Sequence, residues 1–159
     1  MKIQKNLPNH VAIVMDGNGT WSKKNNLQRS DGHQAGVKTA KKIVGYSIEK
    51  GVKNITLYAL SNENLGRSKV ELKNLFDIFF FSFSEEKNFL FENEIKIKFI
   101  GDLEKLPKKL RENVIYLENS TKKNKRLNLF IALNYGGKQD IKQAVKKILN
   151  KKDQNGNFE

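Results

Sequence analysis

Four short apolar runs alternate along the chain with longer stretches whose apolar residues recur at helical spacing. The short runs cover residues 11–15, 55–60, 95–100 and 127–133, and each is typical of a buried strand. The longer stretches predict helices over 36–50, from Ser68 onward, from Pro107 onward and over 140–149. Ser68 is expected to cap its helix, with Glu71 completing a capping box. This alternation predicts an α/β fold with a mainly parallel sheet and helices on both of its faces.

The run at residues 127–133 is apolar at nearly consecutive positions, which is the pattern of a strand buried on both faces. Such a strand normally lies inside a sheet, yet no further strand pattern follows it. Two alternatives remain open, because its outer edge is either exposed or covered by a partner or by a segment missing from this sequence. We expect a single domain over residues 1–150 and a frayed polar tail over 151–159.

The composition narrows the class of protein. The 159 residues suffice for one domain with a real core, and the absence of cysteine excludes disulfides and thiolate metal sites. The first residues lack the apolar stretch of a signal peptide, and no apolar run approaches the roughly 20 residues of a membrane span. These features predict a cytoplasmic protein.

The formal net charge of +13 raises the alternative of a nucleic-acid-binding module. The lysines, however, are spread along the whole chain rather than gathered in one segment, which favours solvated helix faces. We therefore expect no nucleic acid as a partner. The charge then has a secondary effect, an attraction to a diphosphate or to an anionic membrane surface.

Polar and cationic residues follow the first two predicted strands. Because the carboxyl ends of parallel strands meet at one edge of a sheet, such residues suit the grip of an anionic ligand. Asp-Gly and Asn-Gly are also ordinary turn dipeptides, so the first of these segments taken alone favours a plain turn. The residues concerned are Asp16, Gly17, Asn18 and Gly19, with Arg29 and His33 behind them, and Ser61, Asn62, Glu63 and Asn64, with Arg67 behind them.

Taken in order and at their spacing, four segments of the chain resemble the cis-prenyltransferases, in particular the bacterial isoprenyl transferases such as undecaprenyl diphosphate synthase. These segments are residues 15–21, 29–36, 56–67 and 134–137, and the resemblance runs from about Asn9 to Leu149. It implies the family fold, with its last strands beyond this sequence. It also implies a homodimer and a magnesium-assisted condensation of isopentenyl diphosphate with an allylic prenyl diphosphate.

The resemblance also implies roles for the first set of residues. Asp16 is then the metal ligand and a catalytic residue, since magnesium prefers hard oxygen ligands and shares them with substrate phosphates. The backbone of Gly17, Asn18 and Gly19 approaches the diphosphate, which a Cβ would hinder. Arg29, His33 and Arg67 are expected to contact phosphate oxygens. Trp21 is expected beside the apolar part of the substrate.

The second set carries the proton-abstraction region of the family. Asn64 matches the position of the proton acceptor, but an amide is a poor base, so we expect it to orient a relay with Ser61 or a phosphate oxygen. Asn62, Glu63 and Leu65 are expected to lie alongside as substrate-binding residues. Two alternatives stay open for the phenylalanines at 79–81 and 83, which suit either the lining of a prenyl tunnel or an ordinary core.

The chain also departs from the family pattern. Thr20 replaces an arginine of the substrate site, Leu65 replaces an aromatic residue, and Ser68 replaces a proline. Family members continue well past residue 159 into a segment with an Arg-x-Ser phosphate site, a magnesium-binding glutamate and much of the dimer contact. We therefore expect little or no prenyl transfer by this chain alone. The alternatives are a non-catalytic remnant or a partner subunit that binds prenyl diphosphate.

Overall fold

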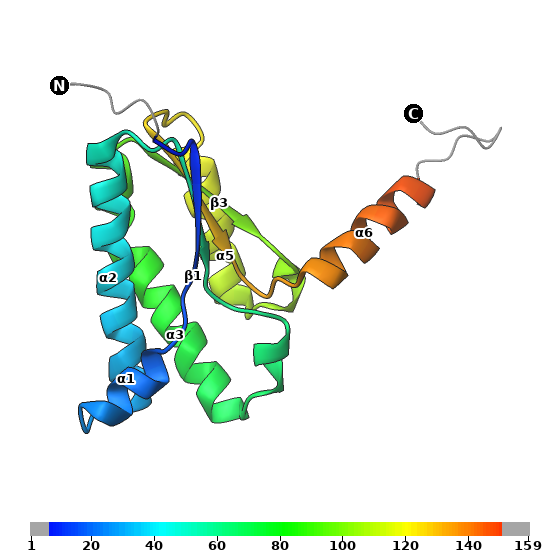
Figure 1. Ribbon diagram of the computed structural model, residues 1–159. Coiled ribbons are helices and arrows are strands. Elements are labelled where there is room, and N and C mark those ends of the chain that lie inside the picture. The colour runs from blue at the N-terminus through cyan, green and yellow to red at the C-terminus, as the bar shows by residue number, and fades with distance from the viewer. Residues whose placement is uncertain (1–6, 151–159) are drawn as a thin grey trace.

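The computed structural model describes residues 7–150 as a parallel sheet with helices packed against it (Figure 1). Most of the predicted strands and helices are present within one or two residues of the expected ends. The elements are β1 (His10–Val14), α1 (Asn18–Lys24), α2 (Arg29–Lys50), β2 (Asn54–Tyr58), the 3₁₀ turn η1 (Glu63–Gly66), α3 (Lys69–Glu85), α4 (Lys87–Glu92), β3 (Ile95–Ile100), the 3₁₀ turn η2 (Leu103–Lys105), α5 (Lys108–Thr121), β4 (Leu127–Ala132) and α6 (Gly137–Asn150).

The strand order in the described part is β1-β2-β4-β3, with every neighbouring pair parallel. The strand β4 therefore lies inside the sheet, which explains its nearly continuous apolar sequence. Both alternatives for the outer edge of residues 127–133 are wrong, because β3 of the same chain takes the outer position and β4 returns between β2 and β3. The two edges of the described sheet belong to β1 and β3.

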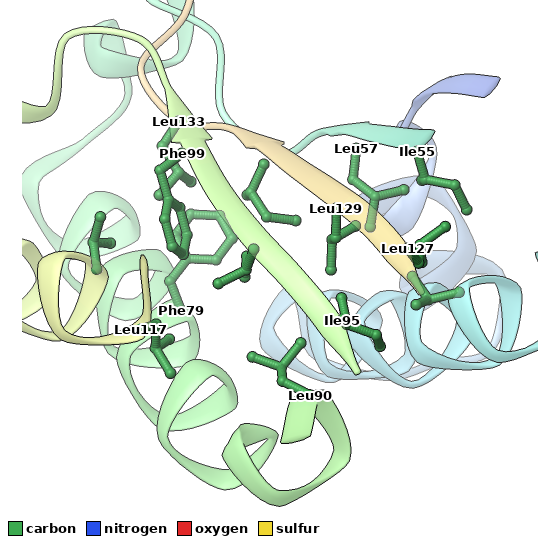
Figure 2. Close-up of a cluster of buried hydrophobic side chains, with 14 of the residues drawn as sticks. Ile55, Leu57, Phe79, Leu90, Ile95, Phe99, Leu117, Leu127, Leu129 and Leu133 are labelled. Atoms are coloured by element: carbon green, nitrogen blue, oxygen red, sulfur yellow. The ribbon is translucent and has the colours of Figure 1, made fainter. Parts of the chain in front are cut away.

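A single apolar core fills the space between one face of the sheet and helices α2 to α5 (Figure 2). Every second strand residue points into it, as the two-residue period of a strand requires. Ile55, Ile95 and Leu127 are buried almost completely, as are Val114 and the other apolar residues of α5 that face the sheet. This core fixes the sheet against the helices that also carry the candidate site.

The opposite face of the sheet is more open. Its side chains include Thr56, Asn128 and Phe130, which are only partly buried. The ring of His10 stacks on Phe130, and its Nε2 lies 2.8 Å from Thr56 Oγ1. The predicted parallel α/β fold is thus confirmed, whereas the expected cover of helices is met on one face only within residues 7–150. The residues predicted as a frayed tail lie outside the described part.

Helix α6 leads away from the sheet (Figure 1). Its apolar side chains form a stripe along one side, and all of them are largely exposed. They are Ile141, Val145, Ile148 and Leu149, with exposed fractions between 49% and 67%. Among the described residues, no helix has the length and apolar character that a membrane crossing needs.

Two helix starts position the site. Helix α2 begins at Arg29 rather than at residue 36, because Gln28 and Asp31 form a reciprocal capping box at its first turn. The helix ends as expected at Gly51, whose φ of 86° suits glycine. Helix α3 begins after Ser68, whose Oγ accepts the backbone N–H of Glu71 at 3.2 Å, as the sequence predicts. Both first turns therefore have fixed geometry.

Candidate active site

The carboxyl ends of β1 and β2 lie side by side, because the two strands are parallel and pair in register from His10 with Asn54 to Val14 with Tyr58. Asp16 follows β1 by two residues, and Ser61 follows β2 by three. The polar segments expected to act together are thereby brought to the same edge of the sheet, which is the usual place for ligands in open α/β sheets.

Asp16 is exposed at this edge, and its Oδ1 accepts the backbone N–H of Gly17 at 2.6 Å. Gly17 has a φ of 84°, a left-handed conformation that an L side chain rarely adopts. The chain therefore turns sharply from β1 into α1. The first turn of a helix leaves backbone N–H groups without intrahelical acceptors, and here that turn begins at Asn18.

Helix α1 packs closely on the first turns of α2. Gly32 is buried there, and a Cβ at this position would collide with the carbonyl oxygen of Asn18. The side chain of Asn18 lies over Gly36, where a Cβ would be 2.6 Å from its Nδ2. Small residues on α2 thus let the segment after β1 approach the cationic end of this helix.

A cavity of about 190 Å³ lies behind the carboxyl ends of β1 and β2. Arg29 and His33 are one helical turn apart on α2, and the same stripe of that helix continues into apolar residues deeper in the cavity. The mouth is polar, and the rest of the lining is mainly apolar, with Lys41, Ser82 and Glu86 as its polar members. The polar lining includes Asp16, Gly17, Asn18, Gly19, Arg29, His33, Asn64 and Arg67, and the apolar lining includes Val37, Ala40, Val44, Leu57, Leu75, Phe79 and Phe83.

Two arginines meet at the mouth, Arg29 from the first turn of α2 and Arg67 from the segment between η1 and α3. Arg67 Nη1 donates to Glu71 Oε1 at 2.9 Å, and Arg29 Nη2 lies 3.3 Å from the same oxygen. The side chain of Arg29 is 53% exposed, whereas those of Arg67 and Glu71 are each 26% exposed. Each guanidinium group has five N–H donors, so donors remain available for an anionic ligand.

His33 lies half-buried beside this cluster. Burial lowers its pKa below the ordinary value of 6.5, and the positive charges of Arg29 and Arg67 lower it further, while Glu71 raises it. Its Nε2 is buried and has no hydrogen-bond partner among the described residues. A buried polar atom without a partner is costly in a folded protein. Because His33 lines the cavity, a water molecule or a ligand there can bond to this nitrogen.

The lowered pKa of His33 predicts how stability depends on pH. The unfolded chain binds a proton at this histidine below about pH 6.5, whereas the folded chain resists protonation until a lower pH. The free energy of unfolding should therefore fall as the pH drops through this range. His33→Gln should reduce the slope of this free energy against pH. Urea unfolding at about pH 7.5 and about pH 5.5 measures both quantities. Equal slopes in the two proteins would contradict the prediction.

Asn64 lies in η1 and lines the cavity. Its Oδ1 accepts the backbone N–H of Ser61 at 3.2 Å, and its own backbone N–H donates to Ser61 Oγ at 3.3 Å. These bonds fix the amide relative to the Ser61 hydroxyl. Glu63 points outward, and its pKa is lowered by its own backbone N–H and by the Ser61 hydroxyl.

The other residues predicted for the site lie around the cavity rather than in its lining. Thr20 is exposed on α1, and Leu65 packs against the apolar core. Asn62 contacts Gly136 across the sheet edge. Trp21 is 47% exposed and lines a neighbouring hollow with Val14 and Ile43, which shares Asp16, Gly17 and Asn18 with the main cavity.

Some lining and supporting residues were not predicted. Glu71 was expected only as a partner of the helix cap, although its carboxylate contacts both arginines. Lys41 and Glu86 line the cavity as an ion pair, with 2.7 Å between Nζ and Oε2. Lys41 follows Arg29, His33 and Val37 at a spacing of four residues, and this spacing is the signal that could have found it.

Comparison with known proteins places this geometry in a family. Residues 14–159 match the family model described as "Putative undecaprenyl diphosphate synthase". The chain is 45% identical over 148 residues to a ditrans,polycis-undecaprenyl-diphosphate synthase of Haemophilus influenzae, covering 93% of this chain and 62% of that protein. It is 42% identical over 154 residues to an isoprenyl transferase of Chlamydia pneumoniae, with 92% and 62% covered. The chain thus spans less than two thirds of these relatives.

Solved structures agree with the sequence relatives. The lavandulyl diphosphate synthase of Lavandula x intermedia, in complex with dimethylallyl diphosphate, matches with a TM-score of 0.87 and 36% identity, over 91% of this chain and 62% of that one. A probable undecaprenyl diphosphate synthase of Campylobacter jejuni matches with a TM-score of 0.76 and 31% identity, over 92% and 64%. The chain therefore belongs to the undecaprenyl diphosphate synthase family of prenyltransferases, the cis-prenyltransferases that its motifs resemble.

Proposed function

We propose that this chain binds an allylic prenyl diphosphate in the cavity behind β1 and β2, as part of a cis-prenyltransferase that condenses this substrate with isopentenyl diphosphate. The observation that carries the proposal is the division of one cavity into a cationic mouth and an apolar interior. A prenyl diphosphate has the same division, because an anionic diphosphate head is attached to a hydrocarbon tail.

The head group occupies the mouth in this proposal. Arg29 and Arg67 donate from their free guanidinium N–H groups, and the backbone after Gly17 supplies further donors. His33 offers its buried Nε2, which has no other partner in the described part. Desolvation of the site strengthens these contacts, since charges interact more strongly away from bulk water.

The tail occupies the apolar interior. Val37 and Ala40 line this part from α2, and Phe79 and Phe83 line it from α3. Each buried methylene group of a prenyl tail contributes about 0.8 kcal/mol to binding. Phe79 and Phe83 also belong to the apolar core, so both alternatives stay open, and their place in the cavity lining supports the proposed contact with the tail. Phe81, by contrast, is 61% exposed and lies outside the lining.

Asp16 fits a magnesium ion that arrives with the substrate. No group of three or more acidic or histidine side chains among residues 7–150 could hold a metal ion. Magnesium often takes only one or two carboxylates and completes its shell with water and substrate phosphates. A single exposed carboxylate at the mouth suits that mode, and the ion would neutralise charge on the departing diphosphate.

Asn64 and Ser61 are proposed to orient the proton transfer that ends the condensation. A bond forms between the allylic carbon and isopentenyl diphosphate, diphosphate leaves, and one proton is lost from the new chain. Because an amide does not accept this proton readily, Asn64 holds the Ser61 hydroxyl or a phosphate oxygen in place to receive it. The hydrogen bonds between these two residues support that role.

The activity of the whole enzyme needs both substrates within reacting distance, and this positioning provides much of the rate. The relatives are longer than this chain, which matches about 62% of their length. We therefore propose that the described residues bind the allylic substrate, and that transfer depends on further residues of the kind found in the relatives. A homodimer, a cytoplasmic location and contact with a membrane surface belong to the same proposal.

Calorimetric titration with farnesyl diphosphate, with and without magnesium, tests the proposal. We expect binding that requires the metal, together with little incorporation of labelled isopentenyl diphosphate by the 159-residue chain. Absence of farnesyl diphosphate binding under both conditions would favour the remnant hypothesis. Robust incorporation would instead show that this chain alone suffices for catalysis. A shift of DNA or RNA mobility at moderate salt would revive the nucleic-acid alternative.

A further inference from the structure

We propose that Glu71 is a positioning residue that holds the guanidinium groups of Arg29 and Arg67 together, so that they clamp one diphosphate. The inference rests on the proposed function of the cavity and adds a residue behind its lining. Glu71 itself does not line the cavity, whereas both arginines do. It therefore acts on a ligand through the arginines and not by contact.

The geometry of the carboxylate supports this role. A single oxygen, Oε1, contacts Arg67 Nη1 at 2.9 Å and Arg29 Nη2 at 3.3 Å. One contact comes from a residue four positions earlier in the chain, and the other comes from the first residue of α2. Glu71 thus connects the first turn of α3 to the first turn of α2 across the mouth of the cavity.

The charges at the mouth show why such a residue is needed. Arg29 and Arg67 carry like charges, which repel each other when no anion lies between them. Arg29 is the more exposed of the two, and a long exposed side chain samples many rotamers. Glu71 stands on a capped helix turn, where its backbone N–H donates to Ser68 Oγ at 3.2 Å. A rigid anion therefore holds a mobile cation in place before the ligand arrives.

The direction of the change in anion affinity on removal of Glu71 distinguishes a positioning role from a simple effect of charge. Removal of a negative charge beside an anion site by itself strengthens anion binding. Loss of positioning does the opposite, because the arginines must then be ordered by the ligand at an entropic cost. Weaker binding after removal of Glu71 would therefore report positioning and could not result from the lost charge.

The test is a calorimetric titration with inorganic pyrophosphate and magnesium on four proteins: the unchanged chain, Glu71→Ala, Glu71→Gln and Glu104→Ala. Glu71→Ala should bind about tenfold more weakly. Glu71→Gln should fall between it and the unchanged chain, because the amide oxygen still accepts from both arginines. Glu104 pairs with Arg111 away from the cavity at 2.6 Å, so its removal is the matched control and should leave affinity unchanged.

A spectroscopic readout accompanies the titration. The NMR signal of Arg29 Nε–Hε in the ligand-free protein should sharpen and shift towards that of a free arginine in Glu71→Ala, with unchanged thermal unfolding. Equal or tighter pyrophosphate binding by Glu71→Ala would overturn the inference while leaving the proposed function intact. Failure of the unchanged chain to bind pyrophosphate would overturn the proposed function, and the diphosphate clamp with it.

Discussion

Replacement of Asp16 by asparagine should remove the magnesium-dependent part of farnesyl diphosphate binding, with a loss in affinity of about 100-fold, or about 2.7 kcal/mol. The carboxylate lies exposed at the mouth of the cavity, directly after β1. An amide oxygen carries no net charge and is a much poorer ligand for magnesium than a carboxylate. Titration with and without the metal measures the difference.

The substitution is conservative for the fold. An asparagine oxygen can still accept the backbone N–H of Gly17, as Asp16 Oδ1 does at 2.6 Å. The turn into α1 should therefore persist, and the loss should be one of binding. Asp77→Asn is the control, because Asp77 is exposed on α3 and lies outside the cavity lining. Retention of the full magnesium effect in Asp16→Asn would contradict the assigned role.

Replacement of Gly32 by alanine should destabilise the protein by about 2–3 kcal/mol, the upper part of the range for overpacking. The added Cβ would collide with the carbonyl oxygen of Asn18 and lie 3.1 Å from the Cβ of Ser22. Ser22 is fully buried, and the colliding atom of Asn18 is a backbone oxygen. Neither group can therefore move away without separating α1 from α2. Farnesyl diphosphate binding should weaken at the same time.

Gly45→Ala provides a matched control within the same helix. A Cβ at position 45 would meet nothing within 4 Å, so only the helix propensity changes. Alanine is favoured over glycine inside a helix by about 0.8–1.0 kcal/mol, and Gly45→Ala should therefore stabilise the protein. Urea unfolding of the two variants should give changes of opposite sign. Stabilisation by both substitutions would show that α1 does not pack on α2 as described.

The sequence predicts local structure well wherever hydrophobic spacing or a cap determines it. The run at 95–100 is strand β3, and Ser68 caps α3 as its spacing from Glu71 implies. Strand order cannot be predicted in this way, because an apolar run indicates that a strand is buried but not which strands flank it. The position of β4 between β2 and β3 depends on crossovers that no local pattern encodes.

The candidate site, too, is predicted by the sequence in part and missed in part. Asp16, Arg29, His33, Asn64 and Arg67 were expected together, and the structure brings them to the lining of one cavity. Their roles toward substrate and metal remain predictions. The contact between Glu71 and Arg29 joins residues far apart in the chain, so local spacing reveals only the capping part of what this side chain does.

The two edges of the sheet that residues 7–150 form differ in how readily they admit another strand. On β3, the outward-facing Lys96 and Lys98 place charges beside the unpaired backbone, which discourages pairing. On β1, the corresponding side chains are His10, Ala12 and Val14, and Val14 is 75% exposed. We therefore expect an added strand, in native assembly or in aggregation, to pair with β1 next to the cavity mouth.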